Sequence, residues 1–356
     1  MTYIIMGYSM RKLLTDLFHS NRLVVAVTIL FVLSATVSIG QGLSAEDGAR
    51  LGIKLVDDKE YSQGIKHLRA ARNLDLGEYE YPFEIGRAFL LWGKAKKAEQ
   101  YFFPLMAHEE VTSELFVLLA DCYSSLDQPK KEIEALEIGL GKFPKSGIIH
   151  SNLGGVYAAV GDGPLALAYW EKGIEVDPGF AENYRHSAQF LASQHDHLWA
   201  WIYGQTYLNL TVANDQPDVS AMNFVRSSLF KLLSMKREKA KATGLDKVLY
   251  DLLFPCAVES ENENSLKSAE VKLKCLVQAW AKVNDRPRVP VLDHMLKVNE
   301  HDRLLEYLFW LYGEADRTEL NEWGANNAAR FNEFATWVYR NGIDLESTKP
   351  FSRLNH

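Results

Sequence analysis

The residues whose types and spacing would suit metal binding are His195 and His197, separated only by Asp196. Imidazole and carboxylate are common zinc ligands, but a site needs about three or four of them. Two histidines at positions i and i+2 point to different sides of a helix, so they would share a metal only in a turn. No cysteine pair or third histidine lies close in sequence. We therefore expect a solvated polar turn, with no resident metal and no cofactor.

Motifs for catalysis are missing as well. The sequence contains no H-E-x-x-H, no G-x-S-x-G and no glycine-rich phosphate loop. Gly154 and Gly155 are expected to be a helix-packing pair, because no strand precedes them. Paired carboxylates such as Glu109 and Glu110 are typical of any helical surface. We expect that the protein is not an enzyme.

Composition and charge limit the class of protein and its partners. Of the 356 residues, 47% are hydrophobic, which predicts a core-forming chain and not a disordered one. The net charge is −7 with neutral histidines, and no basic stripe is present, which argues against nucleic acid as a partner. Three cysteines cannot form a closed disulfide framework. Cys256 and Cys275 would pair in an oxidising compartment, or stay as two buried thiols.

Residues 1–40 form a separate segment with the features of an export signal. Arg11, Lys12 and Arg22 precede an uncharged run over 23–39, and small residues follow it. This layout is typical of a signal peptide, with cleavage after Gly40 or Ala45. The alternative is an uncleaved membrane anchor, although 17 residues fall short of the roughly 20 that span a bilayer. In either case we expect an exported protein, periplasmic or associated with the cell envelope of a bacterium, that contacts a membrane only if residues 23–39 are retained.

Residues 147–180 resemble a tetratricopeptide repeat (TPR), the 34-residue helix–turn–helix unit. Leu153, Gly154 and Tyr157 fall at places seven, eight and eleven of that repeat, and Trp170 at place twenty-four. Small residues at places eight and twenty let paired helices approach closely, and large ones at places eleven and twenty-four fill the space between pairs. The same register continues through four repeats and a degenerate fifth, at 45–78, 79–112, 113–146, 147–180 and 181–214.

The resemblance implies an all-α fold, a right-handed superhelical solenoid over 45–214. Residues 215–356 show apolar positions at helical spacing but no 34-residue period, so we expect a helical C-terminal region that is not assigned to a family. Solenoid ends need a cap over their apolar face. Bulky side chains suited to such a cap are Trp280, Trp310, Trp323 and Trp337.

In the family that the repeats resemble, places two, five, nine, twelve and thirteen of each first helix line a groove. A clamp for chain-end carboxylates would need Lys at place five and Asn at place nine, and no repeat here has them. Acidic residues at place two would also repel a carboxylate. The resemblance implies a groove for a protein or peptide partner, whose predicted contacts are Phe83, Arg87, Leu90, Val117, Asp121, Ile148, Ser151, Arg185 and Gln189.

Two interpretations of these groove positions stay open. Either an external partner docks on them, or the chain's own residues cover them, because apolar helix residues are often core. We expect the protein to be a non-catalytic interaction scaffold or adaptor. The alternative is that the repeats present a ligand-binding or enzymatic domain formed by residues 215–356.

Overall fold

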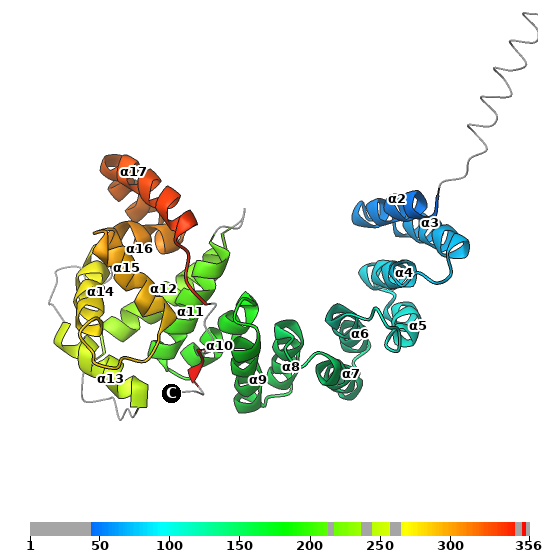
Figure 1. The fold of residues 1–356 in the computed structure, drawn as a ribbon, viewed down its shortest axis with the longest axis horizontal. Coiled ribbons are helices and arrows are strands. Elements are labelled where there is room, and N and C mark those ends of the chain that lie inside the picture. Colours follow the sequence, from blue (N-terminus) through cyan, green and yellow to red (C-terminus); the bar gives the residue numbers. More distant parts are fainter. Residues whose placement is uncertain (1–43, 213–216, 236–243, 257–264, 346–350, 354–356) are drawn as a thin grey trace, which may run out of the picture. The chain divides into compact units, whose positions relative to one another are not determined.

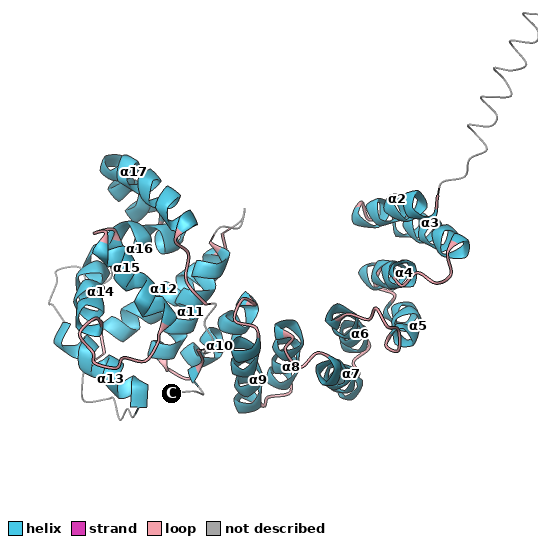
Figure 2. Ribbon diagram, in the orientation of Figure 1, coloured by secondary structure: helices cyan, strands magenta, loops and turns pink. Residues whose placement is uncertain are grey.

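The computed structural model describes residues 44–212, 217–235, 244–256, 265–345 and 351–353. Every regular element in these ranges is a helix, as Figure 2 shows. The chain divides into two compact units, residues 1–101 and 102–356. The prediction of an all-α solenoid of helix pairs is therefore confirmed. Residues 1–40 lie outside the described ranges, within which no helix has both the length and the apolar character needed to cross a bilayer.

The first unit contains the first helix pair and the start of the second. Its helices are α2 (Ala45–Asp57), α3 (Tyr61–Leu74), α4 (Glu80–Leu91) and the first part of α5 (Ala95–Leu105). A Cβ added to Gly64, at place twenty, would lie 2.7 Å from the carbonyl oxygen of Gly52 at place eight. The two backbones of the pair are thus close enough to require small residues at both places.

The second unit begins with three further helix pairs (Figure 1). They are α6 (Ser113–Ser125) with α7 (Pro129–Lys142), α8 (Gly147–Ala159) with α9 (Gly163–Val176), and α10 (Ala181–Ser193) with α11 (His197–Thr211). The helices of each pair contact each other, and the first helices α6, α8 and α10 contact one another in sequence. Stacked pairs of this kind bury apolar faces that a single pair would leave exposed.

The turn between paired helices recurs in all five repeats. Its fifteenth residue has a positive φ each time, 34 positions apart, at Lys59 (64°), Gly93 (72°), Asp127 (54°), Gly161 (89°) and His195 (63°). In each repeat the next amide donates to the carbonyl five residues earlier, at 2.7 to 2.9 Å. This is the Schellman motif, which ends a helix and redirects the chain. The degenerate fifth repeat therefore keeps the turn.

The remaining helices of the second unit are α12 (Val219–Leu233), α13 (Gly244–Leu253), α14 (Leu266–Trp280), α15 (Pro290–Glu300), α16 (Leu304–Tyr312) and α17 (Arg317–Arg340). Two short 3-10 turns, η2 (Phe254–Cys256) and η3 (Gly313–Ala315), accompany them. The α15–α16 pair has the same turn, with a φ of 51° at Asp302 and a bond from Arg303 N to Val298 O. Large Met295 and Tyr307 stand where the repeats have small residues, which explains why no 34-residue pattern is visible.

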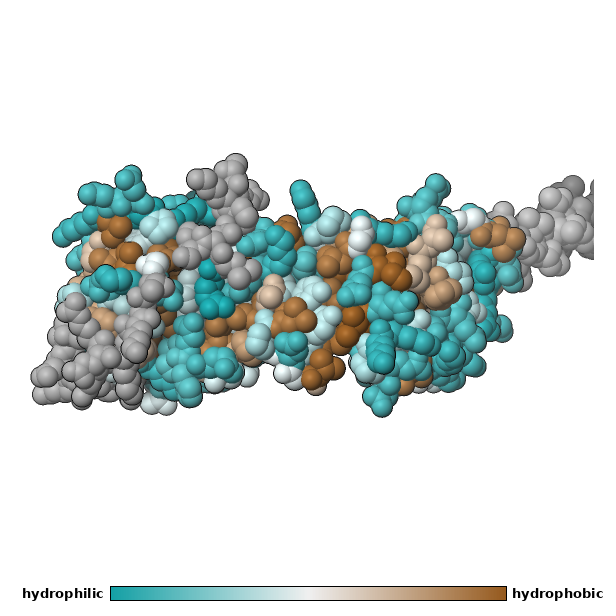
Figure 3. All heavy atoms as spheres, turned by 90° about the horizontal axis from the view of Figure 1, so that it is seen from below, coloured by the Kyte–Doolittle hydropathy of each residue, from teal (hydrophilic) through white to brown (hydrophobic). Residues whose placement is uncertain are grey.

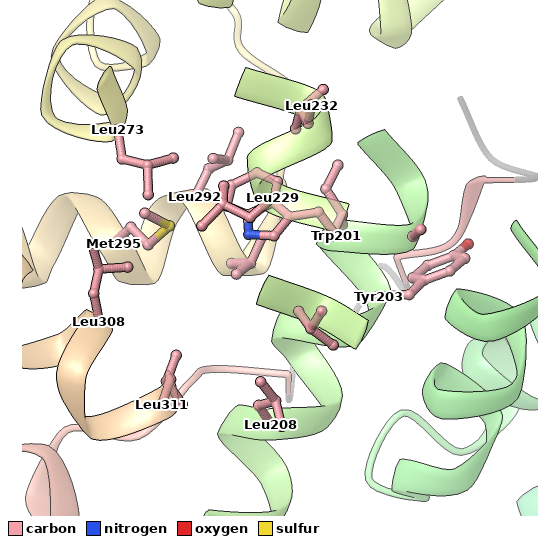
Figure 4. Packing of buried hydrophobic residues seen from close by; sticks show 14 of the residues in the cluster. Trp201, Tyr203, Leu208, Leu229, Leu232, Leu273, Leu292, Met295, Leu308 and Leu311 are labelled. Atoms are coloured by element: carbon pink, nitrogen blue, oxygen red, sulfur yellow. The ribbon is translucent and has the colours of Figure 1, made fainter. Parts of the chain in front are cut away.

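One hydrophobic core joins the last repeats to the C-terminal helices. It runs from Leu167 to Phe351, and every residue of α11 from Leu198 to Leu208 is buried. Figure 4 shows Trp201 of α11 among leucines of α12, α14, α15 and α16. Because α11 is covered on all sides, its sequence is hydrophobic all round and departs from the repeat pattern.

The four tryptophans predicted to form a cap lie in or against this core. Trp280 and Trp323 are buried, and the Trp323 ring stacks on Phe309 at a centroid distance of 4.2 Å. Trp310 and Trp337 are partly buried and both contact Phe334. The core thus contains residues on both sides of the boundary predicted at 214/215.

The structure pairs Cys256 and Cys275 in a disulfide that links η2 to α14. Of the two alternatives left open by the sequence, this is the oxidised one. Cys122 on α6 is buried and lies outside the disulfide.

Candidate partner-binding face

The nine predicted groove residues lie on the first helices of four pairs, three in the first unit and six in the second. Their exposure differs. Phe83, Val117 and Ser151 are buried, Gln189 is exposed, and the other five are partly exposed. The predicted set therefore contains both core residues and surface residues. The contacts of each residue, described below, show to which group it belongs.

On α4, two of the three predicted residues are engaged inside the first unit. The Phe83 ring stacks on Tyr79 at a centroid distance of 5.6 Å. Arg87 pairs with Glu84 at 2.7 Å and with Asp57 at 3.5 Å. Burial raises the pKa of Glu84, and the hydrogen bond from Arg87 opposes that rise. Leu90 is partly exposed and, among the described residues, has no ring stacking or ion pair of this kind. The three predicted groove positions of α4 therefore offer little surface to a partner.

On α6, Val117 belongs to a small core with Leu136, Ile149 and Leu153. Asp121 differs, because its half-buried carboxylate accepts no hydrogen bond and forms no ion pair with any described residue. Burial raises its pKa above the usual aspartate value. A carboxylate that is neither solvated fully nor paired is a favourable place for an incoming cation.

A second carboxylate lies near Asp121, at a position where the repeat pattern is broken. Glu132 of α7 replaces the small residue expected at place twenty. Burial raises its pKa first, Asp121 raises it further, and a hydrogen bond from Ser124 opposes both. Two acidic groups at the junction of α6 and α7 give this end of the face a negative character.

On α8, the exposed places are occupied by very small residues. Gly155 is partly exposed, Ala158 and Ala159 are exposed, and a Cβ added to Gly155 would meet nothing within 4 Å. Ser151 is buried, and its carbonyl accepts the indole N–H of Trp170 at 3.1 Å. The small residues leave room for another backbone to approach α8 closely.

On α10, Arg185 is held by its own helix. Its Nε donates to Glu182 at 2.6 Å, an i to i+3 pair on the partly exposed surface. Gln189, one turn further, is exposed. We define the A-helix face of the second unit by places nine and twelve of its three first helices: Asp121, Ser124, Gly155, Ala158, Gln189 and Ala192.

Ile148 lies at a different feature, a recess of about 610 Å³ beside the turns that precede α8 and α10. Phe143, Pro144 and Phe180 give it an apolar lining. Asp177 also borders it and accepts the backbone N–H of Gly147 at 3.2 Å. Elsewhere, exposed large apolar side chains include Leu91, Phe103 and Ile138. Figure 3 shows apolar atoms gathered in several groups on the face that it draws.

A second recess, of about 560 Å³, lies among the C-terminal helices and bears on the alternative of an enzymatic domain. Three of the charged side chains that line it form contacts at helix ends. Asp316 accepts the backbone N–H of Glu319, Glu319 accepts that of Leu266, and Arg226 pairs with both carboxylates. All three groups are thus used in structural contacts.

Of the two histidines expected in a solvated turn, His195 lies in the turn, whereas His197 is the partly buried first residue of α11. His195 is the exposed positive-φ residue of the fifth turn, and Asp196 accepts the backbone N–H of Trp199 at the start of α11. The two imidazole rings are 6.0 Å apart and nearly perpendicular. Among the residues that the structure describes, no group of three or more His, Cys, Asp or Glu is arranged to hold a metal.

Comparisons with known proteins find similar solved structures but no relative in sequence. No family model and no curated protein matches the chain. A thermophilic TPR protein of Thermus thermophilus matches at 17% identity and a TM-score of 0.42, covering 52% of this chain and 99% of its own. PilF of Pseudomonas aeruginosa matches at 14% and 0.42, with coverages of 58% and 96%. YrrB, described as a TPR protein with an unusual peptide-binding site, matches at 18% and 0.35, with coverages of 48% and 88%.

At these identities and TM-scores the matches carry no argument about this chain. The chain's own geometry defines an all-α solenoid of helix pairs: the same Schellman turn recurs within each pair, and the pairs of the second unit stack on one another.

Proposed function

We propose that this chain is a non-catalytic scaffold that binds a partner protein or peptide on the A-helix face of its second unit. One observation carries the proposal: the half-buried carboxylate of Asp121, which has no hydrogen-bond or ion-pair partner among the described residues, lies on a face whose next helix presents Gly155 and Ala158. Open backbone surface beside a carboxylate suits an extended or helical segment with a lysine or arginine.

The proposed site is narrower than the groove predicted from the repeats. Phe83 and Val117 have core contacts, and Arg87 and Arg185 are paired with acids of their own helices. Charge supports a basic partner, because the whole chain carries −7, and the acidic groups include Asp121 on the face and Glu132 of α7 beside it. Neither nucleic acid nor an anionic lipid surface suits this charge.

We also propose that the protein is exported and acts in the periplasm or cell envelope. The basic and apolar segment over 11–39 supports this, as does the Cys256–Cys275 disulfide, since such bonds persist in oxidising compartments. Retention or removal of residues 23–39 decides between an anchored and a released protein, and N-terminal sequencing of the purified protein distinguishes them.

The test uses a full-length bait, with an envelope extract of the source organism as prey. Ala158→Glu places a longer, charged side chain on the proposed face, and binding of the captured partner should fall at least ten-fold. Asp121→Asn should weaken binding by removing the charge at nearly constant shape. The matched control is Ala328→Glu, an exposed alanine of α17, which should bind as the unaltered chain does.

The outcome against the proposal is equally specific. Equal capture by Ala158→Glu, Ala328→Glu and the unaltered chain would place the partner elsewhere. Equal melting temperatures of the two variants show that the comparison concerns binding and not folding.

A further inference from the structure

A three-residue segment after α17 is seated on the second helices of the last two repeats. Phe351, Ser352 and Arg353 lie against α9 and α11, to which they are connected only through the rest of the C-terminal region. Phe351 and Ser352 are buried, with 6% and 0% of their surface exposed. Burial of successive side chains in so short a segment indicates that it occupies a specific binding surface on α9 and α11, called the seat below.

Each residue of the segment has its own subsite. The Phe351 ring stacks on Trp199 at a centroid distance of 5.7 Å. The Ser352 hydroxyl donates to Glu175 Oε1 at 2.9 Å. Arg353 Nε donates to Glu171 Oε1 at 2.9 Å. The seat therefore recognises an aromatic ring, a small hydroxyl and a guanidinium in that order.

The backbone of the segment is recognised as well. The amide of Arg353 donates to the hydroxyl of Tyr203 at 2.6 Å, and that hydroxyl donates to Glu171 at 3.1 Å. Glu171 is only 1% exposed, so its charge depends on the two groups that donate to it, the Tyr203 hydroxyl and Arg353 Nε. A buried carboxylate left without its cation is costly, which makes the Glu171 subsite selective for a guanidinium.

The receptor side chains are positioned by contacts that do not involve the segment. The indole N–H of Trp199 donates to Asp246 Oδ1 at 2.6 Å, and Lys172 donates to Glu175 Oε2 at 2.8 Å. The Tyr203 ring is packed edge-on against Tyr184. The seat is thus preorganised, which is the property that favours binding of a separate ligand.

We propose that the surface formed by Glu171, Glu175, Trp199 and Tyr203 is a peptide-binding site for an aromatic–small–arginine sequence, with residues 351–353 as its resident ligand. The same sequence supplied by a second copy of the chain occupies the site when the resident segment is released. None of the four receptor residues belongs to the A-helix face, so this site is independent of the one proposed above.

The test supplies the segment as a separate molecule. The full chain carries Phe351→Ala with Arg353→Ala, which keeps the receptor residues, and the probe is a fluorescein-labelled peptide of residues 346–356. Fluorescence anisotropy should show that the probe binds this double variant with a dissociation constant at least ten-fold lower than that for the unaltered chain. Adding Glu171→Gln to the double variant should weaken binding at least ten-fold.

The control removes the same residue types from a place outside the seat. Tyr339→Ala with Arg340→Ala alters an exposed aromatic and an exposed arginine of α17, and it should bind the probe no better than the unaltered chain. A folded Phe351→Ala/Arg353→Ala chain that binds no probe at millimolar concentration overturns the proposal. The proposal is also overturned if the probe binds equally well with and without Glu171→Gln.

Hydrogen exchange on the unaltered chain keeps the proposal testable if the double variant does not fold. The Arg353 amide should exchange at least ten-fold faster than the core amides of α11, because a ligand-like segment releases locally. Equal protection would make the segment an integral part of the core and would refute its role as a ligand.

Discussion

Arg353 and Glu171 form a hydrogen-bonded ion pair at 2.9 Å across a separation of 182 residues. The carboxylate is 1% exposed in its side chain, whereas the guanidinium is 35% exposed. Burial raises the pKa of Glu171 most strongly, and the contacts from Arg353 and Tyr203 only partly oppose it. The pair therefore stabilises an ion that the surrounding core disfavours.

Arg353→Ala should lower the free energy of unfolding by about 2 kcal/mol at pH 7, because a buried carboxylate loses its charged donor. The raised pKa gives the sign of the pH dependence: neutral Glu171 is favoured in the fold at low pH, and its ionisation costs stability as the pH rises through the folded pKa. The loss should thus be smaller near pH 4.5 than at pH 7. Urea unfolding at both values measures it, and a pH-independent loss would contradict this account.

The two adjacent glycines of α8 should respond oppositely to alanine. A methyl group at Gly154 would collide with the Trp170 indole, which is buried and bonded to Ser151 O at 3.1 Å. Overpacking of this kind costs about 1 to 3 kcal/mol. At Gly155 nothing lies within 4 Å, so alanine should stabilise the helix by about 0.5 to 1 kcal/mol.

Thermal or urea unfolding of Gly154→Ala and Gly155→Ala compares the two changes directly. If both variants lost stability equally, Gly154 would have no special place in the helix pair. Gly155→Ala also adds a methyl group to the A-helix face, so the same variant reports on partner binding.

The sequence predicted the helix pairs well because their determinants are local and periodic. Small and large side chains at fixed places predicted four repeats and a degenerate fifth, and the turn at Lys59, Gly93, Asp127, Gly161 and His195 repeats with the same period. The site was harder to predict. Place five is expected to line the groove in each repeat, yet Phe83 and Val117 are core residues, because neighbouring side chains and not the repeat decide burial.

The contacts that the sequence could not predict are those between distant, unpatterned positions. Glu171 at a second-helix place looks like any solvated acid, and Arg353 carries no motif. The substitution of Glu132 for a small residue was a usable signal, since it marks the carboxylate near Asp121. The burial of α11 was not visible, because it depends on helices that follow it by up to a hundred residues.

The Cys256–Cys275 bond should be intact in the protein isolated from its own compartment. Alkylation in denaturant without reductant should then label one cysteine, Cys122, and all three after reduction. Closing a loop with a sequence separation of 19 stabilises the fold by about 3 kcal/mol in the chain-entropy account. Cys256→Ser with Cys275→Ser should lose that amount in urea, and three labelled thiols before reduction would show that the pair is not formed.

His294 should make the second unit sensitive to mild acid. It is 3% exposed, lies edge-on to Tyr307 at 5.4 Å, and its Nε2 has no hydrogen-bond partner among the described residues. Burial lowers its pKa to about 4, and the charge of Lys297 acts in the same direction. The imidazole of the unfolded chain therefore takes up a proton near pH 6.5, whereas His294 in the folded chain stays neutral until about pH 4. The free energy of unfolding that is present above pH 6.5 is consequently lost as the pH falls towards 4.

His294→Gln should remove this component, which amounts to about 2 to 3 kcal/mol between pH 7 and pH 4.5 for a shift of this size. Urea unfolding at the two pH values measures it as a difference from the unaltered chain, so carboxylates that titrate in the same range cancel. His301→Gln is the matched control, because His301 is exposed beside Trp337 and should keep the full pH dependence. An unchanged slope in His294→Gln would mean that the folded core accepts the imidazolium.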